Sequence, residues 1–432
     1  MREIIKKHLS YALYGLPALP LAALTLPVVI YLPKFYSDTL GLSMAVVGAM
    51  LLIARVWDMV SDPLIGMLSD RFAPFHAHRK GWVYLGVIPT LTGAWFLFSP
   101  PDDAGGIYLL FWSVVLYMGW SMMKVPLDAW GAELSDSYHE RSVISGWREG
   151  LTIIGLLSVL GLIATFTKEG AESALGFIAY FLLIGLPLSV AFLWQVPDRR
   201  KRVATEIGVY KGAKIVWENA PFRRLIGSYL LNGVANAIPA TLFLYYVEYI
   251  IGKPDMGGPL LFVYFLCGAL AIPLWMWLAK HISKHHLWAY IMMAVCVPFA
   301  AVPFIDGSLP LFVVIVVLTG FGLGADLTLP AAMQSDVVDV DRVRSGESRA
   351  GLYFAAWGML TKLALAGAYL VFPVMEGLGF DAQAGQRLSL IPYFYALLPV
   401  AFKIAAIALI WQYPLDREKL AEVQEKIKSN QT

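Results

Sequence analysis

Cysteine and charge are both scarce in this sequence. Cysteine occurs twice in 432 residues, as Cys267 and Cys296, and each lies inside an apolar stretch. We interpret both as small packing residues, which excludes a disulfide framework and a cysteine metal site. Charged residues make up 15% of the chain, whereas a soluble domain carries about 25%. The composition therefore excludes an ordinary soluble protein.

The short motifs of common enzymes are missing as well. No CxxC, HExxH, Walker or GxGxxG pattern stands out, and no nucleophile–base or metal-ligand grouping is apparent. We therefore expect no enzyme, no resident metal or cofactor, and no nucleic-acid partner. The first apolar segment is too long for a signal peptide and has no small-residue cleavage site, so we expect it to be retained as a span.

Long apolar stretches are what the chain has instead. Hydrophobic residues make up 58% of it, the mean hydropathy is +0.65, and each stretch is long enough for a hydrocarbon core of about 30 Å. In lipid, an open strand leaves backbone N–H and C=O groups without hydrogen-bond partners, so we interpret the stretches as helices. The twelve predicted spans are 11–33, 41–67, 81–99, 105–132, 143–166, 173–195, 222–250, 258–280, 287–305, 309–333, 350–374 and 389–413.

Lysine and arginine predict the orientation of these spans. If the N-terminus is inside, 25 of the 33 fall on the inner side, four on the outer side, and four within spans, at Arg55, Lys124, Lys362 and Lys403. This bias follows the positive-inside rule. We therefore expect a multi-pass protein of the cytoplasmic membrane, with both termini cytoplasmic and a monomer as the usual form.

The chain divides into two similar halves around a long basic loop. "YLPKFYSDTLG" ends the first span and "YYVEYIIGKP" ends the seventh, while "DPLIGMLSDR" is matched by "IPLWMWLAKH". Six plus six spans with weak internal similarity indicate a major-facilitator transporter. The predicted parts are 1–196 and 222–413 as the two six-helix halves, 197–221 as the cytoplasmic middle loop and 414–432 as the cytoplasmic tail.

Two acids in the second predicted span are candidates for a cation site. Asp58 and Asp62 are four residues apart on one helix face, with Arg55 one turn before Asp58 and Ser61 adjacent. A charge near the bilayer centre costs about 2.5–3.5 kcal/mol. Two neighbouring carboxylates are unfavourable unless a cation or a proton is shared between them. The alternative is structural, in which Arg55 neutralises one acid and the other lies near water.

The fourth span holds a second charged pair. In "GWSMMKVPLDAWGAE", Lys124 and Asp128 are four residues apart, Ser121 lies one turn earlier, and Pro126 removes a backbone donor between them. The pair can present one donor and one acceptor to a polar substrate. It can equally be a self-neutralised pair that eases membrane insertion.

Further charges occur in later spans. Asp326 lies among glycines in "GFGLGADLTLP", and Lys362 in "WGMLTKLALAG" has no carboxylate near it in sequence. Lys362 needs a partner from another helix, and Asp326, Asp58 or Asp62 could serve. Arg148 in "SGWREGL" can act at the substrate site or as a boundary pair with the next residue.

Two charged loops are predicted to form the gate. "SDR" at 69–71 and "DVVDVDRVRSGESR" at 336–349 occupy matching loops, whose ion pairs can form in one transport state and break in the other. The predicted gating residues are Arg55, Asp70, Arg71, Asp336 and Arg342.

Three long motifs resemble one family across essentially the whole chain. "YSDTLGLS…LLIARVWDMVSDPLIGMLSDR", "SMMKVPLDAWGAELSDSYHERSVISGWRE" and "SDVVDVDRVRSGESRAGLYFAAWGMLTK" look like the glycoside–pentoside–hexuronide:cation symporters, the melibiose-permease group. The resemblance implies the twelve-helix major-facilitator fold. It implies transport of a small-molecule substrate with Na⁺ or H⁺ as coupling ion.

The resemblance also assigns residues. Asp58 and Asp62 match the family's cation-site acids, Ser121 matches the hydroxyl from helix four, and Ser61 stands where melibiose permease has asparagine. Lys362 and Arg148 match the lysine of helix eleven and the arginine of helix five.

The sugar-binding positions depart from melibiose permease. Ala22 stands at the sugar-binding aspartate of helix one, Lys124 at that of helix four, and Asp128 at the tryptophan one turn later. With Asp326, these charges are predicted to line the cavity. We therefore expect a cation-coupled symporter of a glycoside or sugar acid working by alternating access. The alternatives are a sodium-coupled carrier of lysophospholipid or another amphipathic anion, and a membrane receptor that does not transport.

Overall fold

The structure, a computed structural model, describes residues 2–72, 74–76, 78–135, 138–166, 171–198, 209–345, 350–382, 384–415, 419–420 and 422–423. Within these residues, twelve helical segments are long and apolar enough to cross a membrane, so the prediction of an all-α, twelve-span protein is confirmed. They are Lys7–Thr39, Met44–Arg71, Arg79–Phe98, Gly106–Gly131, Val143–Ala164, Leu175–Gln195, Ala220–Tyr249, Pro254–Leu278, Lys284–Phe304, Leu309–Asp341, Leu352–Gly377 and Leu390–Trp411.

The chain forms two compact units. The first comprises Met1–Ala204, Lys253–Pro259 and Tyr369–Gln386, and the second comprises Thr205–Gly252, Leu260–Ala368 and Arg387–Thr432. The first unit therefore includes two short segments that come from the second half of the sequence. The eleventh span begins in the second unit and ends in the first.

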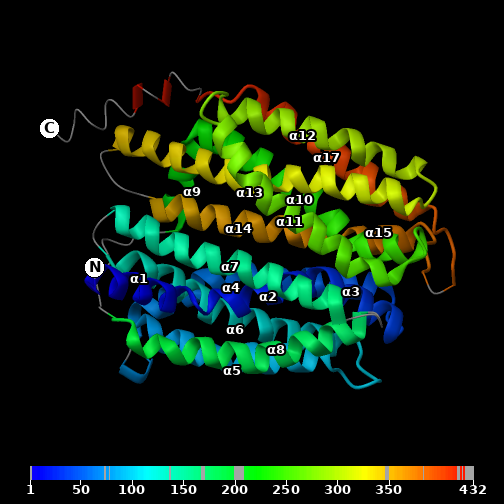
Figure 1. The fold of residues 1–432 in the computed structure, drawn as a ribbon, viewed down its shortest axis with the longest axis horizontal. Helices are drawn as coiled ribbons and strands as arrows, with labels where there is room; N and C mark the ends of the chain where they lie inside the picture. The colour runs from blue at the N-terminus through cyan, green and yellow to red at the C-terminus, as the bar shows by residue number, and fades with distance from the viewer. Residues whose placement is uncertain are drawn as a thin grey trace. The chain divides into compact units, whose positions relative to one another are not determined.

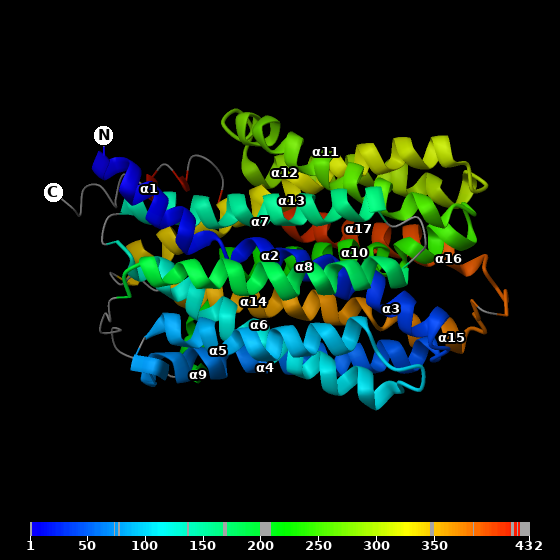
Figure 2. The same cartoon turned by 60° about the horizontal axis from the view of Figure 1, so that its bottom comes forward.

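The first unit is built around three long helices, of which the middle one in sequence, α5, runs antiparallel to α4 and α6. α4, α5 and α6 lie side by side in both views (Figures 1 and 2). A Cβ atom added to Gly93 of α5 would lie 2.7 Å from the backbone of Leu116 on α6, so these helices approach as closely as only glycine allows. The helices of this unit are α1 (Arg2–Gly15), α2 (Ala18–Leu26), α3 (Leu32–Lys34), α4 (Met44–Arg71), α5 (Arg79–Phe98), α6 (Gly106–Glu133), α7 (Tyr138–Phe166), α8 (Ala171–Ala191) and α15 (Val371–Gly377).

The second unit packs around one apolar core. Phe222, Trp288, Leu329 and Ile410 are fully buried in it, and they come from four helices that lie together in both views (Figures 1 and 2). The helices of this unit are α9 (Val209–Glu218), α10 (Ala220–Tyr249), α11 (Gly257–Leu278), α12 (Lys284–Ala301), α13 (Leu309–Ser345), α14 (Ala350–Ala368), α16 (Leu390–Pro392) and α17 (Leu398–Trp411).

The first span is a broken helix. It changes from α-helical to π-helical winding at Pro27–Tyr31 and again at Phe35–Thr39. Pro20, Pro27 and Pro33 each remove a backbone donor, and the wider turns accommodate the missing hydrogen bonds.

Two segments predicted as loops are helical. Residues 69–71 are the last of α4, which runs from Met44 to Arg71. Asp336 was expected in a loop at 336–349, but α13 continues from Leu309 to Ser345. Between Pro330 and Ser345 the sequence has no glycine or proline, so nothing ends the helix earlier. Asp336 therefore lies on a helix.

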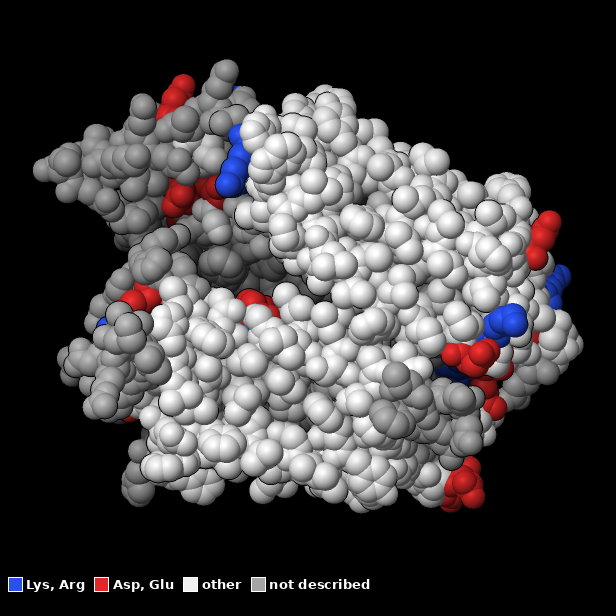
Figure 3. Space-filling model, in the orientation of Figure 1, with Lys and Arg blue, Asp and Glu red and all other residues white. Residues whose placement is uncertain are grey.

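Charge is distributed along the helices as a membrane protein requires. In Figure 3, the long sides of the helices show almost only uncharged side chains, and lysine, arginine and acids gather near helix ends.

Candidate functional site

α4 and α6 bring the predicted cation ligands together in the first unit. The Ser121 hydroxyl on α6 lies 2.6 Å from Asp62 Oδ1 and 3.4 Å from Asp58 Oδ1 on α4. The Ser61 hydroxyl lies 3.1 Å from that of Ser121. Asp58, Ser61 and Ser121 are buried. Four oxygen atoms from two helices thus converge, as the spacing on α4 predicts.

Arg55 is part of the same cluster. Its Nη1 lies 3.2 Å from Asp58 Oδ2, and both side chains are buried. Its guanidinium also stands over the ring of Tyr117, 4.3 Å from the centroid, which is a favourable position for a cation. Two carboxylates and one guanidinium therefore belong to this buried cluster.

The geometry of these oxygens suits a hard cation. Carboxylate and hydroxyl oxygens are the ligands that such ions prefer. Asp58 offers Oδ1 while Oδ2 faces Arg55, so one oxygen of that carboxylate is directed toward Ser121. The residues present therefore fit Na⁺, and the paired acids fit a shared proton equally well.

A second charged cluster joins α6 and α7. Lys124 Nζ lies 2.7 Å from Asp128 Oδ2, as the four-residue spacing predicts. Arg148 of α7 pairs with the other oxygen of Asp128 and, at 2.6 Å, with Glu149. The exposed fraction is 54% for the Lys124 side chain and 38% for that of Asp128. Asp128 therefore links two cations and remains accessible to a solute.

The third cluster lies in the second unit. Asp326 on α13 accepts hydrogen bonds from Asn236 at 2.8 Å and from the Trp288 indole at 2.7 Å. Lys403 on α17 lies 3.5 Å from the same carboxylate and donates to Asn232 at 2.6 Å. The Asp326 side chain is 11% exposed. It therefore lies among four helices of its own unit.

Lys362 lies on α14, a helix that contributes no residue to the three clusters described above. It lies half-buried on α14 in the second unit, one residue after Thr361, whose hydroxyl is 3.2 Å from that of Tyr229. Asp58 and Asp62 belong to the first unit, and the described ion pair of Asp326 is with Lys403.

The predicted gating residues fall in three places. Asp70, near the end of α4, pairs at 2.6 Å with Arg79, which also binds Glu133 at 2.8 Å. Asp336 pairs at 2.6 Å with Lys284 of α12. Arg71 is the exposed last residue of α4, whereas Arg55 belongs to the cation cluster. Arg342 lies on α13, but its side chain is outside the part of the chain that the structure describes.

Sequence reasoning missed several members of these clusters. Lys403 was noted only as a charge within a span, although a lone lysine there already indicates a buried partner. Arg79 was counted for orientation only, yet it is 3% exposed and joins the ends of three helices. Trp288 gave no signal, because tryptophan is common in such spans.

Comparison with known proteins supports a common family. Residues 13–417 match a family model described as MFS/sugar transport protein. The inner membrane symporter YicJ of Escherichia coli is 26% identical over 93% of this chain and 90% of its own length. The sodium-dependent lysophosphatidylcholine symporter 1 of Gallus gallus is 21% identical over 91% of this chain and 84% of its own.

Solved structures share the fold. A crystal structure of the nucleoside transporter NupG matches with a TM-score of 0.71 at 12% sequence identity, over 93% of this chain and 99% of that chain. At this identity the match concerns the arrangement of helices alone.

Proposed function

The chain belongs to the MFS/sugar transport proteins, within the glycoside–pentoside–hexuronide:cation symporters, and we propose that it carries a glycoside or sugar acid together with Na⁺ or H⁺. One observation carries the proposal: oxygen atoms of Asp58, Asp62, Ser61 and Ser121 converge from two helices inside a membrane-spanning unit. Buried acids of this kind mark ion pathways in membranes.

Coupling follows from linkage between two sites. A cation held at Asp58 and Asp62 favours solute binding, and by thermodynamic necessity bound solute favours the cation. Alternating access then moves both across the membrane. Lys362 is proposed to change partner as the cation site fills.

The solute site is proposed at Asp128 and its two cations. Lys124 and Arg148 supply donors, and Asp128 supplies acceptors. The Lys124 and Asp128 side chains, both on α6, are 54% and 38% exposed. Because Lys124 is the most exposed of the three, a carboxylated solute such as a uronate fits it well. Asp326 is proposed to take part in substrate coupling within the second unit.

Orientation and location are part of the proposal. The lysine and arginine bias supports cytoplasmic termini. The likeness to the bacterial inner membrane symporter YicJ supports the cytoplasmic membrane. Asp70 with Arg79, and Asp336 with Lys284, would then act at the cytoplasmic ends of the spans.

Uptake into proteoliposomes tests this function. Neutral glycosides, uronates and lysophospholipids are offered under an inward Na⁺ gradient or an inward proton gradient. We expect one class to accumulate with one ion, and Asp62→Asn to abolish the accumulation. Asp102→Asn, which alters an exposed acid outside the helices, is the matched control. Accumulation that survives in Asp62→Asn would contradict the proposed cation site.

A lysophospholipid is the second candidate solute. The relation to a lysophosphatidylcholine symporter favours it, as does the apolar first helix, where buried Ala22 stands among leucines. Transport of a lipid should depend steeply on acyl chain length, because each buried methylene contributes about 0.8 kcal/mol. Uptake that is indifferent to chain length would exclude this candidate.

A further inference from the structure

One late segment of the chain packs on the cation-bearing helix. Tyr369–Gln386 belongs to the first unit, and its helix α15 contacts α4. A Cβ atom added to Gly48 of α4 would lie 2.8 Å from the carbonyl oxygen of Tyr369 and 3.0 Å from Phe372 Cβ. The backbones meet this closely only because position 48 is glycine.

The segment also caps α4. Glu376 Oε2 accepts the backbone N–H of Ala45 at 2.6 Å, across 331 positions of sequence. The Ser43 hydroxyl accepts the N–H of Val46 at 3.3 Å. The first N–H groups of a helix have no partner within it, and a carboxylate there gains from the helix dipole as well. The start of α4 is therefore held by a residue from the second half of the sequence.

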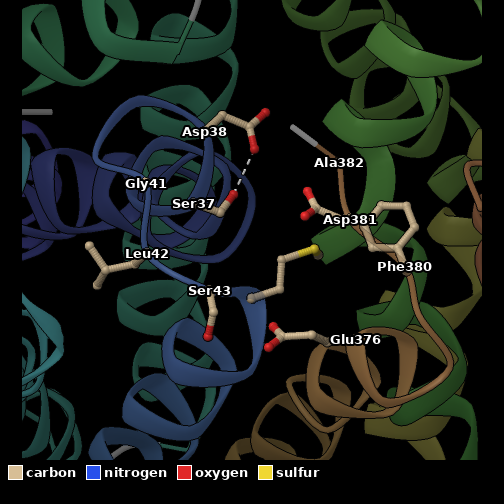
Figure 4. A pocket seen from close by; sticks show the side chains of 10 residues that line it. Ser37, Asp38, Gly41, Leu42, Ser43, Glu376, Phe380, Asp381 and Ala382 are labelled. Carbon is tan, nitrogen blue, oxygen red and sulfur yellow. Dashed lines mark hydrogen bonds between the residues drawn. The ribbon is translucent and has the colours of Figure 1, made fainter. Parts of the chain in front are cut away.

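A polar cavity surrounds this cap. It has a volume of about 240 Å³ and is lined by Ser43 and Glu376, with Asp38 and Asp381 at its sides (Figure 4). Asp38 is already paired with Ser37 and Lys34, and Asp381 accepts the N–H of Ala384. Water can therefore reach Glu376 and compete for the cap without a large rearrangement.

The same segment reaches the cation cluster. Tyr369 is buried, and its phenol is an electrostatic neighbour of the Arg55 guanidinium. Arg55 in turn pairs with Asp58. From Ala45 to Arg55 is ten residues, about 15 Å along the helix. One segment therefore contacts α4 both at its start and beside the proposed cation site.

We propose that Glu376 is a positioning residue for transport: its cap holds the segment Tyr369–Gln386 docked on the outer end of the cation-bearing helix, and cation binding weakens that hold through Arg55 and Tyr369. The inference rests on the proposed function and orientation. A cation at Asp58 Oδ1 shares the carboxylate whose Oδ2 pairs with Arg55, and so weakens the attraction between that carboxylate and the guanidinium beside Tyr369.

Cysteine labelling tests the cap without any substrate. Ala382, 7% exposed on the docked segment, is replaced by cysteine in a background in which Cys267 and Cys296 are serine. A membrane-impermeant maleimide is applied to the outer side of proteoliposomes. We expect Glu376→Ala to speed labelling about fivefold, the effect of losing one helix cap. Glu376→Gln, which keeps an acceptor oxygen, should give a smaller increase.

Two controls distinguish loss of the Glu376 cap from a general destabilisation of the protein. Asp381→Asn removes a charge from the same cavity without touching α4, and it should label at the parent rate. A saturating concentration of Na⁺ should speed labelling in the parent protein and have little further effect in Glu376→Ala. Labelling of Glu376→Ala at the parent rate, or an undiminished cation response in it, overturns the inference. Failure of the proposed function is seen separately, in cation-driven uptake by Asp62→Asn.

Discussion

Ser121 is the residue that joins the two cation-binding acids. Its hydroxyl is within 3.4 Å of both carboxylates and is buried. We expect Ser121→Ala to lower the apparent affinity for the coupling cation about tenfold to a hundredfold, the usual effect of removing such support. Ser121→Thr keeps the hydroxyl and should stay near wild type. Cation titration of transport rate measures both, and equal affinities in the alanine and threonine variants would argue against a ligand role.

Asp326 and Lys403 are expected to depend on each other. Lys403 is buried and the Asp326 side chain is 11% exposed, so removing one leaves a poorly solvated charge without its partner, at a cost of up to about 3–5 kcal/mol. We expect Lys403→Met and Asp326→Asn each to lower the melting temperature in detergent strongly. The double variant should recover much of the loss, because neither charge remains. Additive losses in the double variant would show that the pair is not coupled.

At the scale of elements, α5 positions α6 and hence Ser121. An added methyl at Gly93 would meet the backbone of Leu116 at 2.7 Å. We expect Gly93→Ala to cost about 1–3 kcal/mol of stability, as overpacking does, and to weaken cation affinity by displacing α6. Gly150→Ala on α7 is the matched control, since nothing lies within 4 Å of its added Cβ. Thermal melting measures the loss of stability, and cation titration measures the loss of affinity. Equal melting temperatures and equal cation affinities in Gly93→Ala and Gly150→Ala would show that the contact between α5 and α6 does not position Ser121.

An ion pair joins α1 to α7 at the end of the first span, with Glu140 just outside the fifth. Lys7 donates to Glu140 at 2.8 Å and Ser135 donates at 2.5 Å, and these bonds lower the pKa of Glu140 below its ordinary value. A carboxyl group whose pKa is lowered by folding stabilises the folded protein at every pH above its ordinary pKa. This stabilisation is lost as the pH falls from the ordinary pKa through the lowered pKa. We expect wild type to lose its stability advantage over Glu140→Gln on acidification. Melting temperatures of the two proteins between neutral and acidic pH check the sign; a constant difference would contradict it.

Helices were predictable where local signals sufficed. Apolar runs bounded by charges predicted all twelve spans, and the four-residue spacing on α4 placed Asp58 and Asp62 on one face. The end of α13 was misjudged because clustered charges suggested a loop, although the run from Asp336 to Ser345 has no helix breaker. The cap by Glu376 was not predictable, because its partner lies 331 residues away.

At the scale of the whole molecule, the sequence predicted the family and its helix count. It did not predict that Tyr369–Gln386 joins the first compact unit. Pairing between distant helices depends on packing, which single-sequence patterns do not encode. The same reason explains why Lys403 was not recognised as the partner of Asp326, although both stood out as charges in apolar spans.

The cation site is the central claim, and charge movement without substrate tests it most directly. Purified protein in proteoliposomes on a solid-supported membrane is given a step in Na⁺ at constant pH, and then a step in pH without Na⁺. We predict a transient current for one of these steps in wild type, lost in Asp58→Asn and in Asp62→Asn. A current that persists unchanged in both variants would contradict the account.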